Sequence, residues 1–210
     1  MRLLEYLNKD FYLKRGKRVF DLVIAFSMII LLSPLMILII LAIKLTSPGP
    51  VIYRRKIVSC DGKVISAYKF RTMVKDAENL LRRNPELYKK FAEKHKLEGD
   101  FRVTPIGAFL RKFSLDELPQ FFNVIRGEMS IIGPRMIHPD ELAKYGDNQN
   151  KLLSMRPSMT GYWQVNGRQS TTYNERVQMD LYYIENCCFT LDLVIFLMTP
   201  ITILRAEGAH

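Results

Sequence analysis

The longest apolar run of the chain extends from Leu22 to Ile43, 22 residues without a charged side chain. A run of this length is sufficient for an α-helix to cross the hydrocarbon core of a bilayer. Ser33 and Pro34 stand near its centre. Because proline lacks an N–H, the carbonyl of Ile30 loses its helical partner, and the Ser33 hydroxyl is the nearest group that can replace it. The sequence therefore predicts a membrane helix that is interrupted or kinked at its middle.

The basic residues on the two sides of this run are balanced. Residues 1–18 carry six basic and two acidic side chains, and residues 44–63 carry five and one, so both flanks have a net charge of +4. The positive-inside rule orients a spanning helix by a difference between its flanks, and here there is none. Two interpretations stay open on this ground. The helix turns back inside the membrane and leaves both ends on one face, or it spans with a tolerated proline kink.

The charge of the whole chain is +10, and it is unevenly distributed. Residues 1–112 hold 23 basic and 10 acidic side chains, whereas residues 113–210 hold 8 and 11. A basic half attached to an apolar run suits an anionic membrane surface or ligands that carry phosphate. Nucleic acid is the competing partner, and we rank it lower because no nucleic-acid-binding motif accompanies the charge. The three cysteines lack the number and spacing of a disulfide framework or a zinc site.

The remainder of the chain predicts a mainly helical α+β fold. "SPGP" at residues 47–50 ends the apolar run, and two β-rich runs on either side of Asp61-Gly62 predict a small β-hairpin. Residues 73–98 have a charged helical pattern divided near Pro85. The apolar stretch at residues 189–204 is too short to span, and it suits an interfacial amphipathic helix or a buried one.

The stretch "FLRKFSLDELPQFFNVIRGEMSIIGPR" contains the strongest candidates for chemistry. Ser114 and Glu117 have the spacing of a capping box, which gives the acid pair Asp116-Glu117 a structural interpretation as a helix start. Pro119 conflicts with that cap because it lies past the positions at which a helix tolerates proline, and such conflicts often mark functional sites. With Arg111 nearby, one carboxylate could bind Mg²⁺ and the other could attack phosphorus.

With these residues in view, the chain resembles the bacterial sugar transferase family, the monotopic polyprenyl-phosphate phosphoglycosyl transferases. The resemblance extends from about Lys17 to His210 and rests on motifs in a fixed order. These are "KRVFDL", Ser33-Pro34, "SPGP", "YKFRTM", "LRKFSLDELPQFFNVIRGEMSIIGPR", "RPSMTGYWQVNGR" and the ending from Leu191 to His210.

The resemblance implies an enzyme that transfers a sugar 1-phosphate from a UDP-sugar to undecaprenyl phosphate or a similar polyprenyl phosphate, with release of UMP. It implies a covalent aspartyl-phosphosugar intermediate and Mg²⁺ as cofactor. The reaction would be the first membrane step of exopolysaccharide or O-antigen synthesis, at the cytoplasmic face of the bacterial inner membrane. We favour a hexose such as galactose or glucose as the sugar. The oligomeric state, including a homo-oligomer, is left open, as is a catalytically silent membrane scaffold.

Carried over position by position, the resemblance assigns roles to the residues singled out above. Asp116 would be the nucleophile, Glu117 would hold Mg²⁺, and Arg111 would contact phosphate. Ser33 and Pro34 would form the break of a re-entrant helix. Residues 1–46 would then be the membrane segment, and residues 47–210 the cytoplasmic catalytic domain with a C-terminal interfacial helix.

Three further residues match polar positions of the family. Arg135 in "GPR" and Arg156 in "RPSMTG" would meet the nucleotide or the diphosphate, and Asp180 in "MDLYY" would lie near the site. The chain departs from the family pattern at two places, since Met136 follows "GPR" where proline is usual and Ser158 replaces a glycine. Both departures raise the question of whether the local backbone keeps its geometry.

Overall fold

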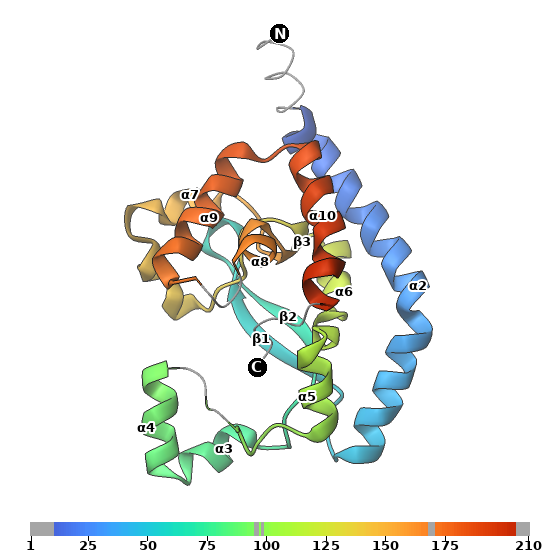
Figure 1. Ribbon diagram of the computed structural model, residues 1–210, viewed down its shortest axis with the longest axis vertical. Coiled ribbons are helices and arrows are strands. Elements are labelled where there is room, and N and C mark those ends of the chain that lie inside the picture. The colour runs from blue at the N-terminus through green and yellow to red at the C-terminus, as the bar shows by residue number, and fades with distance from the viewer. Residues whose placement is uncertain (1–10, 95–96, 98, 168–170, 205–210) are drawn as a thin grey trace.

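The computed structural model describes residues 11–94, 97, 99–167 and 171–204 (Figure 1). Helices make up most of it, and two small sheets of two strands each lie among them. The prediction of a mainly helical α+β fold is thereby confirmed. Within the described residues, one helical stretch is long and apolar enough to cross a membrane, Tyr12–Thr46.

This stretch forms one side of the molecule. A short π-helical segment, η1 (Tyr12–Gly16), leads directly into α2 (Lys17–Thr46), and α2 continues as helix through Pro34. Figure 1 shows α2 changing direction near its middle. Ser33 Oγ donates to the carbonyl of Ile30 at 2.9 Å, so the predicted replacement of the missing N–H is confirmed. The predicted break takes the form of a bend in an unbroken helix.

Polar contacts attach the first half of α2 to the rest of the protein. Arg18 donates to the last two carbonyls of α6 (Gln120–Ile125) at 2.6 and 2.8 Å. The final carbonyls of a helix have no partner within the helix, so a guanidinium satisfies them well. One turn further along α2, the buried carboxylate of Asp21 accepts from the hydroxyl of Ser130 at 2.9 Å.

A buried aspartate joins the start of α2 to α10 (Phe189–Leu204). Asp192, near the start of α10, accepts from the hydroxyls of Tyr12 and Tyr183 at 2.5 and 2.6 Å. Its carboxylate also lies 2.8 Å from the ammonium of Lys17. A buried charge of this kind is tolerated only when it is paired and hydrogen-bonded. These contacts therefore determine how η1, α2 and α10 pack against one another.

The C-terminal end of α2 is also attached to the rest of the protein. After Thr46, the guanidinium of Arg71 donates to the carbonyls of Ser47 and Pro48 at 2.7 and 2.9 Å. Gly49 has a φ of +115°, and a Cβ there would lie 2.5 Å from an Arg71 nitrogen. Glycine is required at this turn because it accepts the positive φ and leaves room for the guanidinium.

The predicted hairpin is confirmed. β1 (Ile52–Val58) pairs antiparallel with β2 (Val64–Phe70). Asp61 and Gly62 both have positive φ, 59° and 73°, and Lys63 donates from its N–H to the carbonyl of Cys60. Two consecutive positive φ values match the right-handed twist of the strands, which is why Asp-Gly is favoured there.

The charged region that follows forms two helices, as predicted. α3 (Ala77–Arg82) and α4 (Pro85–Lys94) are separated at Asn84, and Pro85 begins the second helix. Figure 1 shows this pair extending away from the remainder of the protein. Residues 95, 96 and 98 of the predicted region lie outside the described residues.

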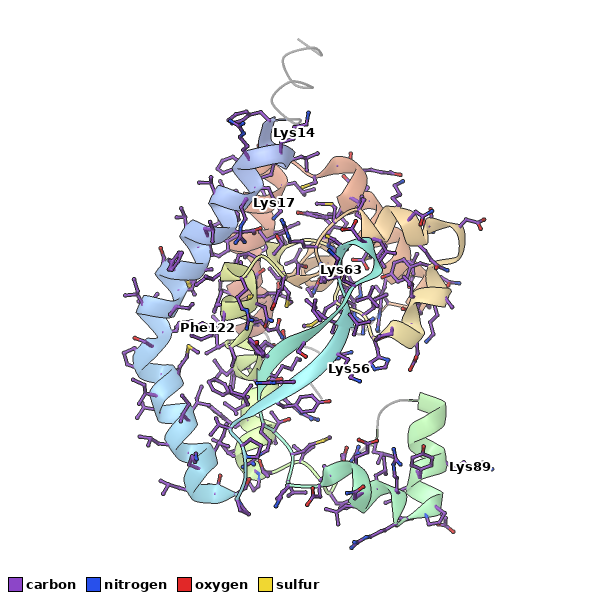
Figure 2. The ribbon with its side chains drawn as sticks, turned by 180° about the vertical axis from the view of Figure 1, so that it is seen from behind. Lys14, Lys17, Lys56, Lys63, Lys89 and Phe122 are labelled. Carbon is purple, nitrogen blue, oxygen red and sulfur yellow. The ribbon has the colours of Figure 1, made fainter. Side chains whose placement is uncertain are left out.

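The second sheet and the remaining helices complete the domain. β3 (Ser130–Ile132) pairs in parallel with β4 (Ser158–Thr160), and the core lies where α2, α6, β3 and α10 meet. Figure 2 shows Lys17 on α2, and Lys56 and Lys63 along the hairpin. The other elements are α5 (Pro105–Lys112), η3 (Leu115–Glu117), η4 (Pro139–Asn148), α7 (Gln149–Leu153), α8 (Tyr162–Asn166) and α9 (Tyr173–Asn186).

The outward face of α2 is apolar and exposed. Ile30, Leu31 and Leu38 are 74%, 69% and 64% exposed, and Leu197 and Ile201 of α10 are also exposed. Contiguous apolar patches of this kind are rare on soluble monomers and mark interaction surfaces.

Candidate active site

The acid pair lies in a tight turn between α5 and α6. Ser114 has a left-handed backbone with φ of 54°, and its side chain makes no capping hydrogen bond. The predicted capping box is therefore wrong. The chain instead forms the single 3₁₀ turn η3, and α6 begins only after Pro119. This arrangement removes the conflict over the proline, because Pro119 precedes the helix and interrupts no helical hydrogen bond.

The turn brings both carboxylates to one lysine of the hairpin. Lys69 Nζ lies 2.5 Å from Glu117 Oε1 and 3.6 Å from Asp116 Oδ2. Lys69 is a site residue that the sequence patterns do not single out. The available signal is a lone charged residue between Tyr68 and Phe70 in the "YKFRTM" strand.

The surroundings of Asp116 alter the pKa of its carboxyl group. Burial raises the pKa of Asp116 above the ordinary range of an aspartate, and the nearby Glu117 adds to this effect. The charges of Lys69 and Arg111 act in the opposite direction. Burial also acts to lower the pKa of Lys69, but the carboxylates of Glu117 and Asp116 outweigh it and raise that pKa. Lys69 therefore remains a cation beside the two acids.

Arg111 is held in place by a hydrogen bond. Its Nε donates to Thr72 Oγ1 at 2.9 Å, and α5 carries its backbone to the edge of the site. The structure thus brings Lys69 to both carboxylates and places Arg111 close enough for its charge to act on Asp116.

The acid pair suits a metal that is shared with phosphate. Mg²⁺ at phosphoryl-transfer sites is held by one or two carboxylates together with substrate oxygens. The side chain of Glu117 is 27% exposed, so its carboxylate is accessible to such an ion. In the part of the chain that the structure describes, no group of three or more His, Cys, Asp or Glu side chains could hold a metal without a substrate.

A second polar cluster surrounds Trp163 of α8. The guanidinium carbons of Arg135 and Arg176 lie 5.2 and 4.8 Å from the indole ring. Burial and the charge of Arg135 lower the pKa of Arg176. Arg135 Nη1 also lies 3.5 Å from the carboxylate of Glu141. Two arginines on one indole form a fixed cationic surface of the kind that recognises phosphate.

Asp180 is a buried residue that contacts the backbone of this cluster. It is 1% exposed, and it accepts from the backbone N–H of Arg135 at 3.1 Å and from the hydroxyl of Tyr145 at 2.7 Å. Burial raises the pKa of Asp180 to about 6, against the effect of both hydrogen bonds and of the Arg135 charge. Asp180 therefore contacts the backbone that carries Arg135.

Arg156 lies elsewhere. Its exposed side chain is close enough to the hairpin turn for its charge to act on Cys60. Lys69 lies at the opposite end of β2. The structure therefore does not bring Arg156 to the acid pair.

Both departures from the family pattern are accommodated. Ser158 is fully buried, and its hydroxyl donates to the carbonyl of Pro134 at 3.0 Å or of Thr160 at 2.7 Å. Met136 is buried in the core. The serine hydroxyl thus adds a tether to the backbone of the "GPR" loop.

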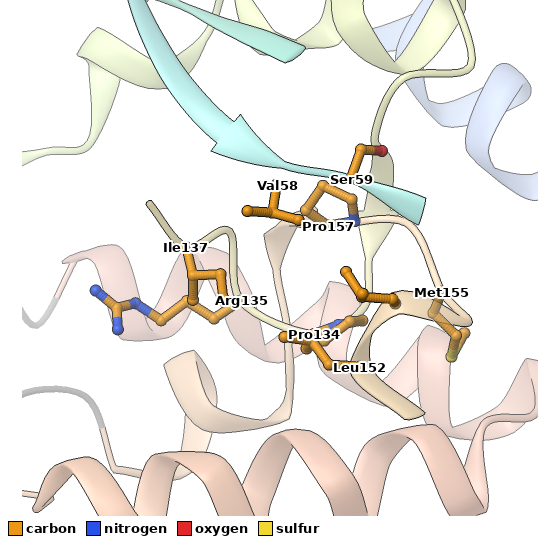
Figure 3. A pocket seen from close by; sticks show the side chains of 9 residues that line it. Val58, Ser59, Pro134, Arg135, Ile137, Leu152, Met155 and Pro157 are labelled. Atoms are coloured by element: carbon orange, nitrogen blue, oxygen red, sulfur yellow. The ribbon is translucent and has the colours of Figure 1, made fainter. Parts of the chain in front are cut away.

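A small cavity lies behind that loop (Figure 3). Its volume is about 10 Å³, enough for about one water molecule. Figure 3 shows the guanidinium of Arg135 directed away from Pro134, Leu152 and Met155, which line the cavity. The surface on the guanidinium side of Arg135, and not this cavity, is therefore available to a ligand.

The structure combines a buried Asp116 and a partly exposed Glu117 beside a lysine with a long helix whose outward face is apolar and exposed. Together these features suit a membrane-associated protein that handles phosphate groups. The comparisons with known proteins identify the family. Residues 12–206 match the family described as bacterial sugar transferase. The chain therefore belongs to the bacterial sugar transferase family.

Curated relatives cover nearly all of this chain. It is 42% identical over 199 residues to undecaprenyl-phosphate galactose phosphotransferase of Salmonella typhimurium, 92% of this chain and 41% of that protein. It is 40% identical over 199 residues to exopolysaccharide production protein ExoY of Rhizobium meliloti, 93% of this chain and 88% of ExoY. It is 37% identical to UDP-glucose:undecaprenyl-phosphate glucose-1-phosphate transferase of Escherichia coli, over 87% of this chain and 39% of that protein. The chain thus spans about two-fifths of the Salmonella and E. coli proteins.

Proposed function

We propose that this protein transfers a sugar 1-phosphate from a UDP-sugar to undecaprenyl phosphate or a related polyprenyl phosphate, and releases UMP. The observation that carries the proposal is the buried Asp116 beside Lys69 and Glu117, in a chain of the bacterial sugar transferase family. The names of the Salmonella and E. coli relatives support a hexose, galactose or glucose, as the sugar. The name of ExoY supports a place in exopolysaccharide production, as the first membrane step of a surface glycan.

In the first step, an oxygen of the Asp116 carboxylate attacks the donor phosphorus that bears the sugar. A bond forms between that oxygen and phosphorus, and the bond from phosphorus to the bridging oxygen breaks. UMP leaves with the bridging oxygen and its electron pair. Lys69 and Arg111 favour the ionised carboxylate that this attack requires and stabilise the negative charge on the phosphoryl oxygens.

In the second step, an oxygen of the polyprenyl phosphate attacks the same phosphorus. The bond to Asp116 breaks, and the carboxylate is regenerated. One site therefore serves the water-soluble donor and the lipid acceptor in turn. At the other end of the site, Arg135 contacts the nucleotide, and Asp180 keeps its backbone in place.

Glu117, with oxygens of the donor diphosphate, would hold Mg²⁺, which supplies neutralisation of the diphosphate charge when bound. Arg156 is assigned to the nucleotide by the family pattern alone, and its place near Cys60 gives it no contact with the acid pair.

A screen for UMP release tests the proposal. The protein in membranes or detergent, with undecaprenyl phosphate, should release UMP from UDP-galactose or UDP-glucose. EDTA should remove the activity and added Mg²⁺ should restore it. A catalytically silent scaffold predicts no UMP from any UDP-sugar, and equal release in EDTA would contradict the role of the metal.

We also propose that α2 enters the membrane from the cytoplasmic face and returns to it, as a re-entrant helix bent at Ser33-Pro34. Contacts at both ends of α2 support this, since Arg18 binds carbonyls of α6 and Arg71 binds those of Ser47 and Pro48. A helix that crossed the bilayer would carry its two ends to opposite faces. Residues 1–46 would form the membrane segment, residues 47–210 the cytoplasmic catalytic domain, and α10 an interfacial helix.

Topology mapping tests the re-entrant helix. Tags at residues 1 and 210 should both be protected in intact bacterial cells and become accessible when the inner membrane is permeabilised. The same two tags in permeabilised cells provide the control for tag exposure. Labelling of one tag from the periplasm would show that α2 spans the membrane and that the bend has another purpose.

A further inference from the structure

Trp163 of α8 is the single tryptophan of the chain, and it contacts residues at the start of α9. Trp163 Nε1 donates to Thr171 Oγ1 at 2.9 Å, and Arg176 Nε donates to the same oxygen at 3.4 Å. The guanidinium carbon of Arg176 lies over the indole, 4.8 Å from the ring centroid. One hydroxyl therefore holds the indole and the guanidinium in a fixed arrangement.

Arg176 differs from Arg135, the other arginine on this indole, in its charge partner. Arg135 lies 3.5 Å from the carboxylate of Glu141, which also pairs with Arg55 of the hairpin at 3.8 Å. Among the residues that the structure describes, Arg176 forms no ion pair, and it is only half-buried. A guanidinium has five N–H donors, and the one directed to Thr171 is the Nε–H. The terminal amino groups of Arg176 are therefore available to a ligand.

The distance of this cluster from the acid pair indicates which part of a UDP-sugar reaches it. If the function proposed above holds, the sugar-bearing β-phosphorus lies at Asp116, and the α-phosphorus is one bridging oxygen away. Both phosphates therefore lie at the acid-pair end of the site. From there, the charged contacts run through Arg55 and Glu141 to Arg135, and only then to Trp163. On the nucleotide side, the group that extends furthest from the reacting phosphorus is the uracil base.

We propose that Trp163 and Arg176 form the subsite for the uracil base, with the Arg176 guanidinium donating to a uracil carbonyl oxygen beside the indole. Guanidinium groups bind the carbonyl edges of bases in this way, and aromatic rings give bases a surface on which to stack. Arg135 then lies between the base and the phosphates. This inference rests on the proposed function and deepens it, because it names side chains that recognise the nucleoside.

The fluorescence of Trp163 tests the inference directly, because no other tryptophan in the chain contributes to the signal. Uridine should change the emission of the unaltered protein in detergent, and the change should saturate. Inorganic pyrophosphate should leave the emission unchanged, because the diphosphate lies at the acid-pair end. An emission that responds to pyrophosphate, or that fails to respond to uridine, overturns the inference. This measurement does not depend on the folding of any variant.

Arg176→Gln distinguishes a contact with the base from a contact with phosphate. The variant should weaken the binding of uridine and of UMP by the same factor, about 10-fold, the scale of a lost hydrogen bond from a charged donor. If Arg176 instead binds phosphate, UMP binding weakens and uridine binding does not, which contradicts the assignment. The matched control is Arg54→Gln, the same change at an exposed position of β1, which should alter neither affinity.

Calorimetric titration with UDP separates this inference from the proposed function. If the unaltered protein binds UDP but Trp163 does not respond to uridine, the uracil subsite is wrong and the proposed function stands. Failure of the unaltered protein to bind UDP at all overturns both.

Discussion

Asp116→Asn should reduce UMP release from the UDP-sugar by at least about 10³-fold, because an amide cannot attack phosphorus as a carboxylate does. The substitution nearly preserves the size of the side chain, so the turn η3 should keep its shape. The same variant should also fail to form a covalent intermediate. Incubating the protein with a labelled UDP-sugar and no lipid acceptor, quenching, and measuring the intact mass should reveal a sugar-phosphate adduct on the unaltered chain.

The control for this experiment is Asp147→Asn, the same change at an exposed position of η4. It should form the adduct as the unaltered protein does. An adduct that persists in Asp116→Asn would exclude Asp116 as the nucleophile, whatever the effect on overall turnover. Loss of turnover with a retained adduct would assign Asp116 to the second step only.

Features of the fold that depend on neighbouring residues could be predicted from the sequence. The hairpin follows from Asp61-Gly62, since only a few residue pairs accept two positive φ values in succession. The division of the charged helices follows from Pro85, and the Ser33 contact follows from the missing N–H of Pro34. Each of these depends on chemistry within about four residues of the chain.

The geometry of the candidate site depends on distant parts of the chain and could be predicted only in part. Asp116, Glu117 and Arg111 are close in sequence, and they also meet in space. Their partner Lys69 is 48 residues away from Glu117 and belongs to a strand. No local pattern specifies that contact. The predicted capping box failed for the same reason, since the Glu117 carboxylate binds Lys69.

The difference between local patterns and distant contacts also explains why the two arginines that the family pattern assigns to the nucleotide lie in different places. Arg135 lies against Trp163 and near Glu141, and Asp180 accepts a hydrogen bond from the backbone N–H of Arg135. Arg156 was assigned in the same way, from a family motif, but it lies beside the hairpin turn. A motif fixes the identity of a residue, whereas the path of the backbone decides which end of the hairpin that residue reaches.

Lys69→Gln should reduce adduct formation at pH 7 by about 10²-fold, the scale of losing one charged group that stabilises a transition state. The variant should also move the acidic limb of the pH–rate profile to higher pH. Burial already raises the pKa of Asp116, and Lys69 opposes that increase, so its removal raises the pKa further. The attack requires the ionised carboxylate. As the pH is lowered, the variant should therefore lose activity at a higher pH than the unaltered protein does. Part of the rate should return in alkaline buffer.

Two variants separate charge from structure in this test. Lys69→Arg keeps the positive charge, and its acidic limb should stay close to that of the unaltered protein. Lys56→Gln removes an exposed lysine from the opposite face of the same hairpin and should change neither the rate nor the profile (Figure 2). If Lys69→Gln slows the reaction equally at every pH, Lys69 acts on the donor alone and does not control the ionisation of Asp116. A shifted limb, in contrast, requires that the lysine and the nucleophile interact as the 3.6 Å separation of their charged atoms indicates.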